Sequence, residues 1–72
     1  MRFITGKEFA KIIEGHGWIL LRVSGSHHIY GKPGSIIRLS GPIHGNAPLK
    51  LGLLKNLMKM GGLAESDFES IT

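Results

Sequence analysis

The chain has 72 residues, a formal net charge of +4 and no cysteine. A chain this short buries only about 60% of its unfolded surface, so we expect one domain over residues 1–72. The absence of cysteine excludes disulfides and thiolate metal sites and is compatible with a reducing compartment. No stretch approaches the ~20 apolar residues of a membrane span. Lys7 and Glu8 interrupt the start of the chain before any signal-peptide core, so we expect a cytoplasmic protein.

Positive charge is concentrated in the first 64 residues, which hold nine Lys or Arg against two acids. The last eight residues hold the other three acids and no Lys or Arg. A positive body attracts polyanions through counterion release, which favours a nucleic-acid partner. A basic surface that serves solubility alone is the alternative.

The first predicted element is a helix over residues 6–16. Thr5 and Glu8 have the spacing of a capping box, in which each side chain bonds the other residue's backbone N–H. Gly17 suits the left-handed position after the last turn. The following residues recur at helical spacing and form one stripe, apolar apart from the last: Phe9, Ile12, Ile13 and His16.

Three short strands follow in a predicted antiparallel meander. Residues 18–23 are mostly apolar and predict a largely buried strand, and Trp18 is expected in the core. Gly25-Ser26 is a two-residue hairpin turn, and residues 27–30 form the returning strand. A second turn at residues 32–34 precedes a third strand over residues 35–39.

The rest of the chain predicts a loop and two further helices. Residues 40–48 are rich in Gly and Pro and are expected to be irregular, long enough for a binding loop. Residues 49–60 form an amphipathic helix that Gly61-Gly62 ends, and residues 65–70 form a short last helix. The core face of the amphipathic helix comprises Leu53, Leu54, Leu57, Met58 and Met60.

These elements define an α+β fold of order α-β-β-β-α with a short C-terminal helix. Each long helix has a single stripe to bury, so both must cover the same face of the three-stranded antiparallel sheet. The other face is then open to solvent or to a partner.

His27 and His28 are the most informative residues of the predicted sheet. Adjacent strand residues point to opposite faces, so only one imidazole can address a ligand on the open face. Tyr30 shares the face of His28, which assigns His28 to packing and turns His27 outward. A solvated histidine with no further role is the alternative for His27.

Histidine accepts and releases a proton near neutral pH, which suits cleavage of RNA. RNA carries its own nucleophile, the 2′-hydroxyl, so a positioned acid or base is worth ~10²–10⁴ in rate without a metal or other cofactor. Ser26 and Arg22 are candidates for holding phosphate, as is Lys50 at the start of the second long helix. His44 is a further candidate contact, or a residue that stiffens its loop. The four histidines lack metal-ligand spacing, so we expect no metal site.

The sequence resembles the HicA family of small toxins. The resemblance spans residues 5–70 and rests on an ordered set of positions: Gly17-Trp18, Arg22, Gly25-Ser26-His27, Tyr30, Pro42, His44-Gly45, Lys50, Gly52, Gly62-Leu63 and Phe68. It implies a fold like that of double-stranded-RNA-binding domains and metal-independent cleavage of mRNA that arrests growth. It places the catalytic histidine at His27. Ser40-Gly41 departs from the family pattern, which predicts that the third strand ends early.

The resemblance also implies a partner, a HicB-like antitoxin that covers the His27 face. The toxin alone would be a monomer, and it would form a hetero-oligomer with the antitoxin. The residues alone are compatible with two other classes of protein: an RNA-binding module of the same fold without catalysis, and a protein-interaction subunit. No membrane partner is expected.

Overall fold

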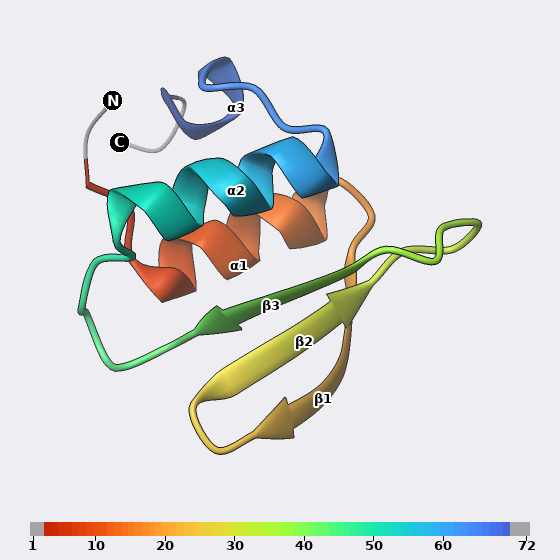
Figure 1. The fold of residues 1–72 in the computed structure, drawn as a ribbon, viewed down its shortest axis with the longest axis horizontal. Helices are drawn as coiled ribbons and strands as arrows, with labels where there is room; N and C mark the ends of the chain where they lie inside the picture. The colour runs from red at the N-terminus through yellow and green to blue at the C-terminus, as the bar shows by residue number, and fades with distance from the viewer. Residues whose placement is uncertain (1–2, 70–72) are drawn as a thin grey trace.

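The structure is a computed structural model in which residues 3–69 are described. Its elements in chain order are α1 (Gly6–Gly15), β1 (Ile19–Ser24), β2 (His27–Gly31), β3 (Arg38–Pro42), α2 (Leu51–Gly61) and α3 (Ser66–Glu69). The strands form one antiparallel sheet in the order β1-β2-β3 (Figure 1). The predicted α-β-β-β-α order is confirmed. Ser70, which was predicted in the last helix, lies outside the described residues.

The capping box predicted at the start of α1 is present. The Thr5 hydroxyl accepts a hydrogen bond from the Glu8 N–H at 3.1 Å, and the Thr5 N–H donates to the Glu8 carboxylate at 2.9 Å. Phe9, Ala10 and Ile13 form the buried stripe of the helix. These contacts fix where the helix begins and which side faces the sheet.

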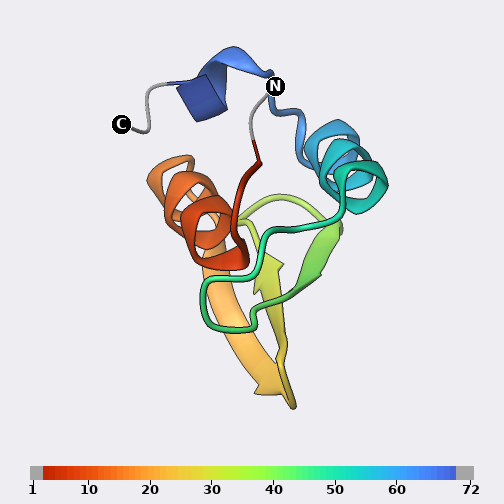
Figure 2. The ribbon, with the colours of Figure 1, turned by 90° about the vertical axis from the view of Figure 1, so that its left-hand side faces the viewer.

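Both long helices cover the same face of the sheet, and α3 lies over them on the side away from the strands (Figure 2). From the sheet, Tyr30 and Leu39 enter the core beneath the helices, and they are only 4% and 1% exposed. Among the described residues, the buried hydrophobic side chains form one cluster: Ile4, Phe9, Ala10, Ile13, Trp18, Tyr30, Leu39, Leu49, Leu54, Leu57, Met58 and Phe68. The predicted burial of Trp18 is therefore confirmed.

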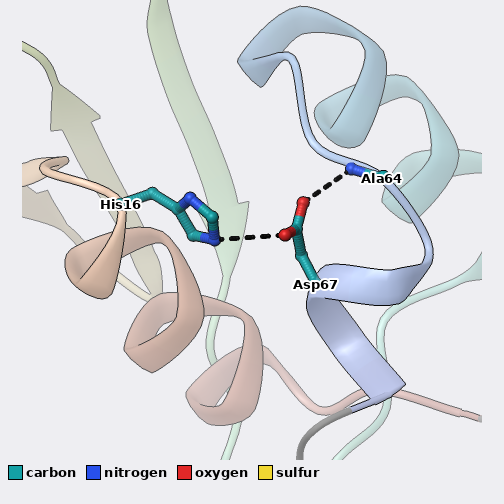
Figure 3. Close-up of polar contacts among 3 residues, drawn as sticks. All are labelled: His16, Ala64 and Asp67. Carbon is teal, nitrogen blue, oxygen red and sulfur yellow. Dashed lines mark hydrogen bonds and ion pairs between the residues drawn. The ribbon is translucent and has the colours of Figure 1, made fainter.

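Helix α3 is attached to α1 at two places, Phe9 in the helix and His16 at its C-cap. The Phe68 and Phe9 rings stack with centroids 5.9 Å apart. His16 Nε2 lies 3.5 Å from one Asp67 carboxylate oxygen, and the other accepts from the Ala64 N–H at 2.8 Å (Figure 3). Asp67 thus caps its own segment and faces His16 at the same time.

The prediction that residues 18–23 form a largely buried strand is wrong. All six residues of β1 are exposed. The strand is at the edge of the sheet and projects away from the helices, so neither of its faces is covered (Figure 1). A short apolar run is equally compatible with a buried strand and with an exposed one, because periodicity does not show which strand is the edge.

The third strand also differs from its prediction. It covers Arg38–Pro42 rather than residues 35–39, and so extends through Ser40-Gly41 instead of ending before them. Its register pairs Arg38 with Gly31 and Pro42 with His27. Residues 35–37 are irregular and follow the turn at residues 33–34, and the Ile37 N–H donates to the Ser35 hydroxyl at 3.1 Å. Pro42 is tolerated because β3 is an edge strand and Pro42 is its last residue.

Helix α2 begins at Leu51, two residues later than predicted. Leu49 is buried but lies before the helix, and its N–H donates to the Ile4 carbonyl at 2.8 Å. Lys50 is therefore the N-cap residue. Met60 is 41% exposed and does not belong to the core, in contrast to its prediction. The helix ends at Gly61, within the Gly61-Gly62 pair predicted to stop it, and Gly62 follows in the left-handed region with φ of 67°.

Gly6 gives a test of how the loop after β3 is held. A Cβ atom at Gly6 would lie 2.6 Å from the Pro42 carbonyl oxygen and 3.1 Å from the Ile43 Cα, both in the backbone. Gly6→Ala is expected to lower the free energy of unfolding by about 1–3 kcal/mol, measured by urea denaturation. Gly15→Ala is the matched control, because a Cβ at Gly15 meets nothing within 4 Å. It should stabilise the helix slightly. A Gly6→Ala protein as stable as the parent would show that this close approach is not required.

Candidate functional site

The β1–β2 hairpin places His27 on the open face of the sheet. Gly25 makes the turn with φ of 61°, a conformation that favours glycine. His27 is the first residue of β2 and lies between Ser24 of β1 and Pro42 of β3. It is exposed, whereas Tyr30, on the opposite face, is buried. The predicted outward orientation of His27 agrees with this alternation.

His28 lies on the helix-covered face. It is half-buried, and its Nδ1 is 3.4 Å from the Ser26 carbonyl oxygen. It lines a small cavity beneath the helices together with Phe9, Tyr30 and Leu39. The two adjacent imidazoles therefore have separate surroundings, one in solvent and one against the core.

Tyr30 is held by α1. Its hydroxyl donates to the Glu14 carboxylate at 3.2 Å. Burial raises the pKa of Tyr30 to about 12, and the negative charge of Glu14 and this hydrogen bond add to the effect. The bond ties β2 to α1. It thereby fixes which face of the sheet the helices cover and which face carries His27.

A β-bulge at Leu21 adds Arg22 to the His27 face. The register shifts between Leu20 and Arg22, so that Arg22 pairs with Ile29. Directly paired residues share a face, and Ile29 lies on the same face as His27. In a bulge, two consecutive residues oppose one partner, which re-aims the residues that follow. Regular alternation from Ile19 would instead have turned Arg22 toward the helix side.

Ser26 and the loop after β3 meet at the same end of the sheet. The Ser26 carbonyl accepts a hydrogen bond from the Ile43 N–H at 2.8 Å. His44 follows directly in this loop and is exposed. Since Pro42 pairs with His27, the loop leaves the sheet beside the candidate catalytic residue.

A groove of about 380 Å³ connects the loop to the start of α2. Its polar lining residues are His44 and Lys50, and Pro42, Leu49 and Leu53 form part of its apolar wall. Lys50 caps α2 without a side-chain hydrogen bond to the helix. The first-turn N–H groups of α2 and the Lys50 ammonium are therefore both suited to an anion.

The structure thus brings the predicted residues together in two groups. His27, Ser26 and Arg22 are on the hairpin, with His27 and Arg22 facing the open side. His44 and Lys50 line the groove next to it. Pro42 links the groups, because it pairs with His27 and also lines the groove.

Sequence reasoning did not identify three polar residues of the open face. Ser24 pairs directly with His27, Ser40 with Ile29, and Arg38 with Gly31. Only the strand register reveals these neighbours. The signal present in the sequence is charge: no acid occurs between Glu14 and Glu65, whereas that stretch holds Arg22, Lys32, Arg38, Lys50, Lys55 and Lys59.

The described part of the chain contains neither a metal-ligand cluster nor a membrane-spanning helix. Within residues 3–69, no three His, Asp or Glu side chains are grouped so that they could hold a metal ion. Over the same residues, none of the helices combines the length and apolar character needed to cross a bilayer.

The fold and the site define a small basic α+β domain with one free sheet face that carries a histidine. A family model described as HicA toxin of bacterial toxin-antitoxin matches residues 6–63, and the chain therefore belongs to the HicA family. It is a toxin-family protein, and its family implies an antitoxin partner. None of the curated proteins compared with the chain matches it.

Titration of Tyr30 tests the contact that fixes the orientation of β2. The chain has a single tyrosine, so the ultraviolet absorbance of the phenolate reports this residue alone. We expect a midpoint of about 12 instead of the ordinary 10.0. The pKa is raised in the folded state, so the protonated Tyr30 hydroxyl contributes to the free energy of unfolding. This contribution should be complete below pH 10 and decline as the pH rises toward 12.

Glu14→Gln should move this midpoint down, since it removes the neighbouring charge. Glu65→Gln, at the start of the acidic C-terminal segment, is the control and should leave it unchanged. A parent midpoint near 10 would mean that Tyr30 is not buried against α1.

Proposed function

We propose that this toxin is a metal-independent endoribonuclease that cleaves mRNA in the cytoplasm and thereby arrests growth, with His27 as general acid and base. One observation carries the proposal: His27 is exposed on a sheet face with Arg22 and without any acidic residue in the strands. The family assignment supports a toxic activity, and the basic surface supports a nucleic-acid substrate.

In the proposed reaction, His27 accepts the proton of a ribose 2′-hydroxyl. The 2′-oxygen then forms a bond to the adjacent phosphorus while the bond from phosphorus to the 5′-oxygen breaks, and the departing oxygen takes the proton that His27 carries. Arg22 and the hydroxyl of Ser26 hold the phosphate and stabilise the charge that develops on it. DNA lacks the 2′-hydroxyl and is not cleaved by this route.

Lys50 and His44 act further along the RNA in this proposal. Both line the groove beside Pro42, so a chain that passes His27 can continue into it. The N-terminal amides of α2 and the Lys50 ammonium then bind a second phosphate. A HicB-like antitoxin inactivates the toxin by covering the His27 face. We expect the toxin alone to be a monomer and to form a hetero-oligomer with the antitoxin.

The first test is His27→Ala. The variant should lose about 10²–10⁴-fold in RNA cleavage, measured in chelator-containing buffer, because a positioned acid and base is lost. Its thermal unfolding should be unchanged, since the side chain is exposed. His28→Ala is the matched control and should lower stability, because His28 is half-buried against the core. Full cleavage by the His27→Ala protein would refute the assignment.

If RNA binding persists in the parent protein without any cleavage, the protein is a binding module of the same fold. If it binds no RNA, it serves protein interaction alone.

The second test is the salt dependence of RNA binding. Lys50→Ala should weaken binding and reduce the slope of log K against log salt by about 1, because one phosphate contact is lost. Lys59→Ala is the control, since Lys59 is exposed in the last turn of α2, at the opposite end from the groove. An equal change in slope for the two variants would remove Lys50 from the site.

A further inference from the structure

The outer edge of β1 is unpaired within the part of the chain that the structure describes. β1 pairs only with β2, at one end of the sheet order. The free N–H and C=O groups of an edge strand are a template for another strand. Native proteins usually protect such edges with lysine, proline or bulges. β1 contains neither lysine nor proline, and its only protection is the bulge at Leu21 and the charge of Arg22.

Four of the six side chains of β1 are apolar and exposed to solvent. Ile19 is 53% exposed, Leu20 42%, Leu21 51% and Val23 51%. Scattered exposed apolar residues are ordinary, but a contiguous group on one strand of a small domain marks an interaction surface. The β1 edge therefore offers both backbone hydrogen bonds and apolar contacts to a partner.

A hollow of about 260 Å³ lies next to this edge on the open face. Ile19 and Leu21 contribute apolar walls, and Arg38 and Lys32 contribute positive charge. Its floor includes Gly31: a Cβ atom there would lie 2.7 Å from Leu21 Cδ1 and 3.2 Å from Arg38 Nη1. A glutamate side chain fits this lining, with its methylene groups on the apolar walls and its carboxylate facing Arg38.

Charge selects an acidic partner over a second copy of the chain. The strands and their turns contain three cations and no acid: Arg22, Lys32 and Arg38. Pairing two β1 strands would bring these cations of both copies together, which is unfavourable. An acidic segment would instead gain from each of them.

The composition of the face favours a peptide over an RNA strand. Single-stranded RNA is held largely by stacking its bases on aromatic side chains. The aromatic residues nearest to β1 are Trp18 and Tyr30, and both are buried at 4% exposure. The exposed residues are aliphatic, which suits strand addition, where backbone bonds give affinity and alternate side chains give specificity.

We propose that the outer edge of β1 and the adjacent hollow bind a β-strand of the antitoxin in which acidic and aliphatic residues alternate. The carboxylates face Arg22 and Arg38 on the open face, and the aliphatic side chains, which alternate to the opposite face, pack on Leu20 and Val23. Arg22 is also a proposed phosphate contact, so the strand would compete with RNA; this consequence rests on the proposed function. The docking itself does not require that His27 is catalytic.

The probe is a short synthetic peptide in which glutamate alternates with valine, added to the ¹⁵N-labelled full-length protein. We expect saturable NMR shift changes over residues 19–24 and slower hydrogen exchange of the outward β1 amides. A peptide with lysine in place of glutamate should bind at least about tenfold more weakly. Saturable changes confined to other elements, or no saturable binding, would overturn the proposal.

Two matched variants separate docking from general effects of charge. Ile19→Glu should weaken peptide binding at least about tenfold, because it puts a carboxylate into the hollow. Ile36→Glu makes the same change at a 95% exposed residue outside the hollow, and binding should stay within about twofold. Equal effects of the two variants would overturn the proposal.

Two further outcomes identify other occupants and would also overturn it. In one, a single-stranded oligouridine shifts residues 19–24 and the peptide does not. In the other, the protein alone dimerises through β1, seen as concentration-dependent shifts of the same amides. Loss of cleavage is scored separately in the His27→Ala protein, so either proposal can fail while the other stands.

Discussion

Burial of two helix stripes on a single face of a three-stranded sheet is the constraint on which this structure depends. α1 and α2 each have one apolar side, and both are used against Tyr30, Leu39 and the segments that join them. Residues 3–69, which the structure describes, contain no further helix long enough to cover the other face. That face stays in solvent. The toxic activity of the family has to use surfaces that are not buried in the core.

The alternation of side chains along β2 then puts packing residues on one face of the sheet and His27 on the other. His28 and Tyr30 point toward the helices, and the bond from Tyr30 to Glu14 holds the strand in that orientation. His27 is consequently turned outward. The bulge at Leu21 has a similar effect in β1, because it turns Arg22 to the face of the sheet that carries His27. A single inserted residue thus puts a cation and an imidazole on one surface.

Local features of this fold could be predicted from the sequence because their causes are local. The capping box of Thr5 and Glu8, the Gly25 turn and the end of α2 at Gly61-Gly62 each depend on a few adjacent residues. The faces of His27 and His28 were predictable from alternation alone. The sequence also pointed to Lys50, although it did not show that Lys50 caps α2 from outside the helix.

What could not be predicted depends on pairing between distant segments. The apolar residues of β1 resemble a buried strand, and only the sheet order shows that they lie at an exposed edge. The bounds of β3 follow from its register with β2, which no local signal in residues 35–42 reports. For the same reason the sequence did not show that Ser24 adjoins His27, or that Arg38 and Ser40 share its face.

Proton transfer by His27 to and from an RNA chain that supplies its own nucleophile is tested most directly by the chemical ends of the cleavage products. Mass spectrometry of a cleaved oligoribonucleotide should find a 2′,3′-cyclic phosphate on one fragment and a 5′-hydroxyl on the other. The same oligonucleotide with one 2′-deoxyribose at the cleaved position should resist cleavage there. Products with 5′-phosphate ends, or undiminished cleavage at the deoxyribose, would contradict this role.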